Sequence, residues 1–351
     1  MKSDIVIAGG GIIGLYNAYL LAQHGIKITL IDKSDFGKES TWAAGGILTP
    51  LLPWDYQEDI LFLTHDASSS YKSLATRLLE KTHYDIEHWE CGLTVYSSNT
   101  SQIKQWCQLN RVPCTVDHSH PIHVHLSNVA QVRTPILVKA LIKQLKALGV
   151  TLLHNTSVQH CDVVDNKIVA VQTSNGKIST QKLIWATGAW APTLHSHQIQ
   201  LRTPNVKPIR GQMIAIQKSP VKLNHILFCN GHYLIPRKDG LILAGSTLED
   251  VGFENATTEE ARQQLWKKSL ELMPELSQAH ISYHWAGLRP GSKSNIPTIG
   301  PHPEIKGLFY NCGHFRYGIA MAPKACEILT NWVINGSNSL SEQEKSYACM
   351  N

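Results

Sequence analysis

The residues nearest the N-terminus have the types and spacing that suit binding of a dinucleotide. Gly9, Gly11 and Gly14 follow a short apolar run in a G-x-G-x-x-G pattern. The first glycine permits a tight turn, the second lets backbone amides approach a pyrophosphate, and the third lets a helix pack closely on a strand. Asp32 follows Gly9 by 23 residues, where its carboxylate would accept hydrogen bonds from ribose hydroxyls. We therefore predict a dinucleotide site; the alternative is a glycine-rich corner without a ligand.

The elements around these glycines are the ones that such a site needs. Residues 5–8 are predicted to form a buried strand, 15–22 a helix that stops at Gly25, and 27–31 a second strand that ends at Asp32. The N-terminus of a helix carries partial positive charge, which favours a phosphate. The pattern fits FAD and NAD equally well, because both present an ADP moiety to the same turn.

More α/β structure is predicted far downstream. A helix begins near Thr134, the expected N-cap, and stops at Gly149; strands follow over 150–153, 167–173 and 182–185. Near the C-terminus we predict a strand over 308–311 and a helix over 319–333 with Pro323 in its first turn, ended by Gly336. The last residues, 337–351, are polar and are expected to fray.

The segments between these pieces have a different character. The segment 53–128 combines helical patterns with short strands. The segment 201–283 alternates apolar and polar residues before a predicted helix over 259–272. We therefore expect an α/β fold with a β-rich second domain: a Rossmann-like nucleotide domain in three sequence segments, with an inserted antiparallel-sheet substrate domain. The expected nucleotide domain comprises 1–52, 129–200 and 284–336, the substrate domain 53–128 and 201–283, and a polar tail 337–351.

Composition argues against several classes of protein. With 43% hydrophobic and 17% charged residues, the chain of 351 residues is expected to be compact and to hold two domains. The net charge of +5 is dispersed, which argues against nucleic acid as a partner. Eight scattered cysteines without a CxxC pair suit a reducing cytoplasm. The N-terminal apolar stretch lacks an A-x-A-like cleavage site, so we expect no targeting segment and no stable membrane association.

Histidines cluster at His118, His120, His123 and His125. Alternate residues of a strand share a face, and imidazole is a good metal ligand. Chance clustering also explains the run, because the chain contains 18 histidines. We expect no functional metal.

Three further motifs resemble the D-amino-acid oxidase family of FAD-dependent oxidoreductases. The segment Glu39–Leu48 is similar to that family's stretch beside the flavin ring, and so are 287–291 (GLRPG) and 313–319 (GHFRYGI). With the N-terminal glycines, these matches span nearly the whole chain in the family's order. Within the family, the continuation over 49–54 most resembles the glycine oxidases of thiamine biosynthesis.

The resemblance implies bound FAD and oxidation of glycine, sarcosine, D-alanine or another small amino acid to its imine by hydride transfer to flavin N5. It further implies reoxidation by oxygen to give hydrogen peroxide, a role in thiazole formation, and homo-oligomers. Neither Cys nor His occurs in 39–46 or 287–297, so we expect non-covalent FAD. The alternatives are a D-amino-acid dehydrogenase that passes electrons to a quinone or carrier, and a dinucleotide-binding protein without activity.

Carried over residue by residue, the resemblance implies that Arg289 binds the substrate carboxylate, that Tyr233 is a pocket tyrosine, and that Arg316 either joins them or only covers the flavin. A guanidinium can take a carboxylate through two charge-assisted hydrogen bonds, and a tyrosine hydroxyl in an apolar run needs a partner. Leu248 is expected to limit the pocket. We name no general base, because orientation and exclusion of water suffice. The expected cofactor contacts are Gly9, Gly11, Ile12, Ile13, Gly14, Asp32, Lys33, Ser40, Thr41, Ala43, Ala44, Gly45, Gly46, Val158, Thr187, Gly188, His314, Arg316, Tyr317, Gly318, Ile319 and Ala320.

Overall fold

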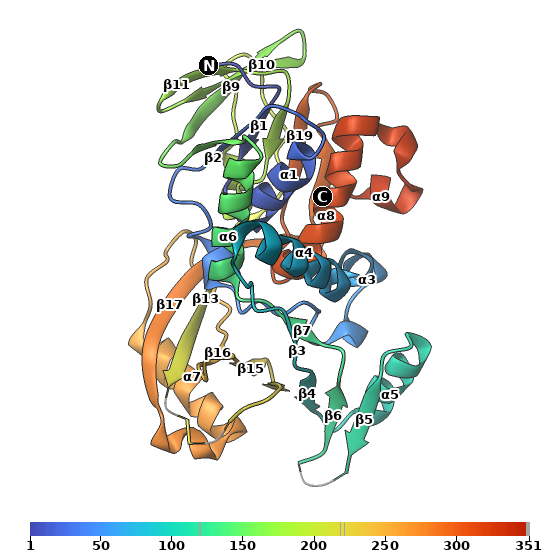
Figure 1. The fold of residues 1–351 in the computed structure, drawn as a ribbon, viewed down its shortest axis with the longest axis vertical. Coiled ribbons are helices and arrows are strands. Elements are labelled where there is room, and N and C mark those ends of the chain that lie inside the picture. Colours follow the sequence, from blue (N-terminus) through green and yellow to red (C-terminus); the bar gives the residue numbers. More distant parts are fainter. Residues whose placement is uncertain (119–120, 218, 221, 349–351) are drawn as a thin grey trace.

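Two large sheets form the framework of the computed structural model, which describes residues 1–118, 121–217, 219–220 and 222–348. A six-stranded sheet lies in the upper half of Figure 1, and an eight-stranded sheet lies in the lower half. Among the described residues, no helix is both long enough and apolar enough to span a bilayer.

The six-stranded sheet carries the glycine turn. Its order is β18-β19-β12-β1-β2-β8, with all neighbours parallel except β18 and β19. The central strands are buried on both faces, which explains why they are continuous apolar runs in the sequence. The strands come from three separate parts of the chain, and the expected Rossmann-like sheet is confirmed. Their bounds are β1 (Ile5–Ala8), β2 (Ile28–Ile31), β8 (Thr151–Leu153), β12 (Leu183–Trp185), β18 (Thr298–Pro301) and β19 (Leu308–Cys312).

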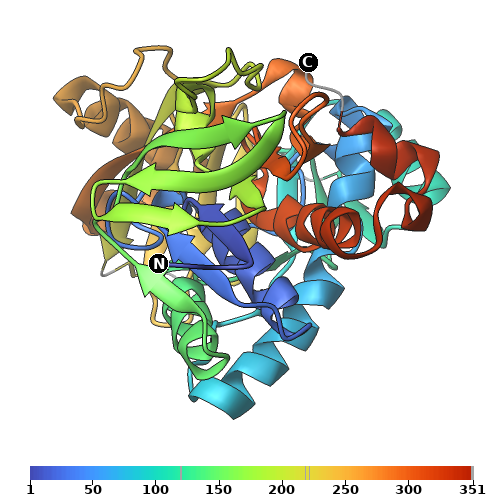
Figure 2. The same ribbon diagram turned by 90° about the horizontal axis from the view of Figure 1, so that it is seen from above.

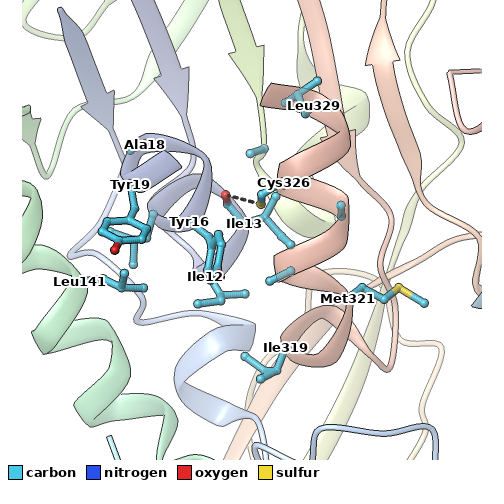
Figure 3. Packing of buried hydrophobic residues seen from close by; sticks show 14 of the residues in the cluster. Ile12, Ile13, Tyr16, Ala18, Tyr19, Leu141, Ile319, Met321, Cys326 and Leu329 are labelled. Atoms are coloured by element: carbon cyan, nitrogen blue, oxygen red, sulfur yellow. Dashed lines mark hydrogen bonds between the residues drawn. The ribbon is translucent and has the colours of Figure 1, made fainter. Parts of the chain in front are cut away.

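Helices pack on one face of this sheet. Figure 3 shows the contact between α1 and α8, where Ile12, Tyr16 and Ile319 belong to one apolar core and the Cys326 thiol donates to the Ile13 carbonyl at 3.4 Å. These side chains fix the start of α1 against the start of α8. The helices in this layer are α1 (Ile12–Ala22), α3 (Glu58–Thr64), α4 (Ala67–Thr82), α6 (Thr134–Ala147) and α8 (Gly318–Asn335).

A three-stranded antiparallel sheet packs on the other face. Its strands are β9 (Val158–Val164), β10 (Lys167–Thr173) and β11 (Gly176–Ser179), drawn in green in Figure 2. Val163 and Ile168 from this sheet join Val6 of β1 in a second core.

The eight-stranded sheet forms the β-rich part of the fold. Its order is β17-β13-β16-β15-β14-β4-β6-β5, and β4 is parallel to β14 while the other neighbours are antiparallel. The helix α7 (Glu259–Leu272) contributes Leu265 to the core on one face. The strands are β4 (Leu93–Tyr96), β5 (Cys114–Asp117), β6 (His123–Leu126), β13 (Lys207–Gln217), β14 (Ile226–Cys229), β15 (His232–Pro236), β16 (Ile242–Gly245) and β17 (His280–Gly291).

Shorter elements connect these parts. A two-stranded ribbon pairs β3 (Trp89–Glu90) with β7 (Ala130–Gln131). The remaining helices are α2 (Ser40–Ala43), α5 (Thr100–Leu109) and α9 (Glu342–Ser346).

The division of the chain differs from the expected one in two places. The helices α3 and α4 pack on the nucleotide side, because Leu63 and Tyr71 belong to the same core as α1. The strand β17 pairs with β13 along its whole length, so Arg289 stands on the eight-stranded sheet and not in the third nucleotide segment. Helical periodicity reveals an apolar face, but it does not reveal which sheet that face will cover.

The expectation of a frayed C-terminal tail is wrong for the described residues. Ser341 and Glu344 form a capping box at the start of α9. Tyr347 is 2% exposed, and its hydroxyl donates to the Asp59 carbonyl at 2.7 Å. One buried aromatic side chain therefore anchors a segment whose composition is polar.

Two helix starts also differ from expectation. Pro323 lies in the second turn of α8 and not in the first, so the Ile319 carbonyl loses the backbone donor that an ordinary residue would supply. The buried Tyr71 hydroxyl donates to that carbonyl at 2.9 Å and replaces the missing bond. At α6 the N-cap is Arg133, and the Thr134 hydroxyl instead donates to the Ala44 carbonyl at 3.2 Å.

Candidate active site

A cavity of about 400 Å³ is lined by residues of both large sheets, a size typical of ligand and cofactor sites. The structure brings nearly all the expected site residues to it. Those that line it are Gly9, Gly11, Ile12, Ile13, Asp32, Lys33, Ser40, Thr41, Ala43, Ala44, Gly45, Gly46, Val158, Thr187, Gly188, Tyr233, Arg289, His314, Arg316, Tyr317, Gly318 and Ile319.

Three expected residues do not line the cavity. Gly14 instead lets α1 pack closely on the glycine turn, because a Cβ there would lie 1.8 Å from the Gly9 carbonyl oxygen. Ala320 is buried in the core around α8. Leu248 is 52% exposed and does not line the cavity, although its neighbours Thr247 and Glu249 are hydrogen-bonded to Arg289 and Arg210. The expectation that Leu248 limits the pocket is therefore wrong.

The nucleotide end of the cavity is built around the turn between β1 and α1. Gly9 has φ of +104°, and a Cβ there would lie 2.3 Å from the Ala186 carbonyl oxygen, so only glycine fits. The Asp32 carboxylate is fixed by the backbone amides of Gly10 at 2.6 Å and Ser34 at 2.8 Å. The Thr41 hydroxyl accepts a hydrogen bond of 2.9 Å from the Ile12 amide at the start of α1.

Buried polar atoms along the cavity fit an extended cofactor such as FAD. Thr187 Oγ1 and His314 Nε2 are buried and have no hydrogen-bond partner among the described residues, and such atoms normally find one. Two helix N-termini, those of α1 and α8, contribute Ile12 and Gly318 to the lining. Burial lowers the pKa of His314 to about 3, so its imidazole is neutral and cannot act as an acid at neutral pH.

The other end of the cavity holds the Arg289 guanidinium. Its nitrogens donate to the Thr247 carbonyl at 3.1 Å and to the Ser246 hydroxyl at 2.8 Å. Among the described residues, no carboxylate forms an ion pair with it. Burial lowers the pKa of Arg289 from its ordinary value; Tyr233 opposes that shift, and the positive charge of Arg316 adds to it. Three of the four residues expected to bind substrate, Arg289, Tyr233 and Arg316, therefore lie close enough to interact.

Strand β13 holds Arg289 in place by two means. Gly211 leaves room for the side chain, because a Cβ there would lie 2.0 Å from Arg289 Nη1. The next residue, Gln212, exchanges hydrogen bonds with Thr247: its amide donates to Thr247 Oγ1 at 2.8 Å, and its carbonyl accepts from the Thr247 amide at 3.2 Å. Farther along, Arg210 Nε donates to Glu249 Oε2 at 3.0 Å. This network fixes the segment from which Arg289 receives its hydrogen-bond partners.

Several lining residues were not predicted from the sequence. Met213 and Phe228 supply apolar walls from β13 and β14. Which residues of a strand face the cavity depends on sheet register, which the sequence does not reveal. Tyr56 also lines the cavity, and its hydroxyl hydrogen-bonds that of Tyr317. Its position two residues after the motif at 49–54 was the available signal in the sequence that Tyr56 belongs to the site.

Comparisons with known proteins agree with this site. A family model described as DAO, FAD dependent oxidoreductase, matches residues 4–332. Glycine oxidase of Pseudomonas aeruginosa is 37% identical over 94% of each chain. The bifunctional protein ThiO/ThiG of Trichormus variabilis is 29% identical over 95% of this chain and 53% of its own length. The crystal structure of glycine oxidase from Bacillus cereus has a TM-score of 0.86 and 26% identity, and the match covers 100% of this chain and 99% of that one.

The family model spans almost the whole described chain, and the glycine cradle and unpartnered polar atoms fit its cofactor. The expected family, FAD cofactor and enzyme class are confirmed. The chain belongs to the DAO family of FAD-dependent oxidoreductases and is an enzyme of the amino-acid oxidase type.

Proposed function

We propose that the enzyme oxidises glycine and other small amino acids, such as sarcosine and D-alanine, at the Arg289 end of the cavity. The observation that carries this proposal is a guanidinium that lines the cavity beside Tyr233 without a carboxylate partner among the described residues. A substrate carboxylate would supply that partner through two charge-assisted hydrogen bonds. The names of the glycine oxidase relatives support the same substrate class.

Bound FAD supplies the two-electron acceptor. Arg289 and the Tyr233 hydroxyl would hold the substrate carboxylate, which fixes the orientation of the α-carbon. The apolar side chains of Met213 and Phe228 would exclude water and restrict the size of the substrate. The substrate amine is expected to react in its neutral form, because its nitrogen lone pair forms the imine as hydride leaves the α-carbon, and the neutral His314 imidazole supplies no proton that would oppose this. The N-terminal end of α8 carries partial positive charge that would stabilise negative charge on the reduced cofactor.

We propose that FAD is held without a covalent bond. Cys312 is a cysteine that lines the cavity, but burial raises the pKa of its thiol well above the ordinary value. Since the thiolate is the reactive form, attack on the cofactor is disfavoured. Acid precipitation should release the yellow colour into the supernatant, and colour that stays with the pellet would contradict this part of the proposal.

We propose oxygen as the electron acceptor, and the thiazole-forming branch of thiamine biosynthesis as the destination of the imine. The first rests on the glycine oxidase relatives, and the second on the motif resemblance and the match to ThiO/ThiG. A peroxidase-coupled assay with glycine in air should detect one hydrogen peroxide per substrate oxidised. Turnover with a quinone or dye but without peroxide would identify a dehydrogenase instead. The proposed role in thiamine biosynthesis is tested by expressing the enzyme in a thiamine-requiring strain that lacks its own glycine oxidase and measuring growth without thiamine.

The association of copies of the chain stays a prediction. Light scattering on the eluate of a sizing column measures it directly, with the mass of 39.0 kDa as the value for one chain.

A further inference from the structure

Three histidines meet on the three-stranded sheet, outside the cavity. His160 lies on β9, and His195 and His197 follow the short helix η2 (Gly188–Thr193). Each offers one ring nitrogen, and these nitrogens lie within 4.8 Å of one another. The rings of His160 and His197 have centroids only 4.1 Å apart. These histidines are separate in the sequence from the run His118–His125, of which His120 lies outside the described residues.

The backbone brings these histidines together, so the cluster does not depend on chance side-chain contacts. The Cys161 amide donates to the His195 carbonyl at 3.0 Å, which attaches the segment after η2 to β9. The Cys161 thiol donates to the same carbonyl at 3.6 Å. This attachment places the ring of His195 beside that of His160, with centroids 6.1 Å apart.

A carboxylate supports the cluster. Asp162 follows His160 by two residues on β9 and therefore lies on the same face. Its Oδ1 lies 3.5 Å from His160 Nε2. Its Oδ2 accepts a hydrogen bond of 2.7 Å from Gln172 and forms an ion pair of 3.2 Å with Lys177. Histidines that bind metal are commonly oriented by such a carboxylate.

We propose that His160, His195 and His197 bind a divalent transition-metal ion such as Zn²⁺, with Asp162 as the residue that orients His160. Zinc binds imidazole nitrogen at about 2.0–2.1 Å, so tetrahedral nitrogen ligands lie about 3.3 Å apart. His195 and His197 are exposed, so rotation of their rings toward that geometry would disrupt no core packing, although it would break the 3.4 Å contact between His195 Nδ1 and the Thr193 carbonyl. Imidazole ligands favour zinc, copper and nickel over magnesium and calcium.

The position of the metal suggests what it does. Gly188, Trp190 and Thr193 of η2 line the cofactor cavity, and so does Val158 at the start of β9. A metal held by His160, His195 and His197 would link these two walls. Its ligands would stand two to four residues along the chain from the lining residues Val158 and Thr193. Metal binding is therefore expected to stabilise the folded enzyme and to slow the loss of its FAD.

The test uses the tag-free, FAD-loaded enzyme after treatment with EDTA, titrated with Zn²⁺ in a calorimeter. We expect one Zn²⁺ per chain and a higher melting temperature with Zn²⁺ than with Mg²⁺. His160→Ala and His197→Ala should each weaken binding at least about tenfold, and Asp162→Asn about 10–100-fold. His154→Ala is a matched control, because His154 is an exposed histidine 3.4 Å from the Asp35 carboxylate.

The variants are informative because His197 is exposed and the loss of its ring removes no core packing. The FAD absorbance and circular dichroism of each variant verify that it is folded. The proposal is overturned if the His160→Ala/His197→Ala double variant binds Zn²⁺ as the unmodified enzyme does. It is also overturned if His154→Ala weakens binding as strongly as His197→Ala.

Discussion

Substitution of Arg289 by alanine tests the carboxylate site. It removes the guanidinium that Ser246 and Thr247 hold at the cavity beside Tyr233. Loss of one partner of a buried charged pair costs about 2–5 kcal/mol. Arg289 is only partly buried, so screening by solvent favours the lower part of this range. At about 1.36 kcal/mol per factor of ten, the full range corresponds to a roughly 30-fold to 5,000-fold fall in kcat/KM for glycine, and the result is expected toward the 30-fold end.

The assay measures initial rates over a range of glycine concentrations, with FAD occupancy determined from the absorbance of each preparation. Ser246→Ala is a companion variant, because it keeps the charge and removes one hydrogen bond to it; a loss of about 1.5–3 kcal/mol of transition-state stabilisation is expected. Arg262→Ala is a control that breaks an exposed ion pair with Glu259 and should leave the rate unchanged. If Arg289→Ala retains both full FAD occupancy and the original kcat/KM, then Arg289 does not bind the substrate carboxylate.

Three further variants test separate parts of the structure. Gly211→Ala places a Cβ 2.0 Å from Arg289 Nη1, so the guanidinium must shift; steady-state kinetics should show at least a tenfold loss of kcat/KM, and unchanged kinetics would argue against this packing. Tyr71→Phe leaves the buried Ile319 carbonyl without its donor, which should cost about 1–3 kcal/mol in urea unfolding; equal stability would contradict that account. Burial lowers the pKa of His232 to about 4, below the ordinary value of about 6.5. The unfolded chain then binds more protons between these values, and stability falls as the pH drops. Between pH 6.5 and 5, His232→Gln should remove about 2 kcal/mol of the fall in the free energy of unfolding. Urea unfolding at both pH values measures this, and an identical pH dependence in both proteins would refute it.

Local signals in the sequence were sufficient for the nucleotide turn. Gly14 and Asp32 contact residues of the same strand-turn-helix-strand unit, and Gly9 has a positive φ in its turn, so their spacing alone indicated the elements. The order of the later motifs then indicated the fold class and led to Arg289 and Tyr233. These residues do line one cavity.

Features that depend on distant contacts could not be predicted. Leu248 is exposed between Thr247 and Glu249, which both bond to Gln212 of β13, and the sequence does not reveal that pairing. Tyr347 anchors a polar tail only because it meets Asp59. Tyr71 compensates for Pro323 across 248 residues of sequence. His160 and His197 meet through a backbone contact between β9 and the segment after η2, and no periodicity in the sequence reports such a contact.

The spectrum of the purified enzyme under anaerobic conditions, recorded before and after addition of glycine, tests the central claim most directly. If a bound flavin faces a substrate held by Arg289, glycine should bleach the oxidised-flavin absorbance, and admission of air should restore it. The Arg289→Ala variant should bleach much more slowly at the same glycine concentration. An enzyme that carries FAD but shows no bleaching with glycine, sarcosine or D-alanine would contradict the proposed chemistry.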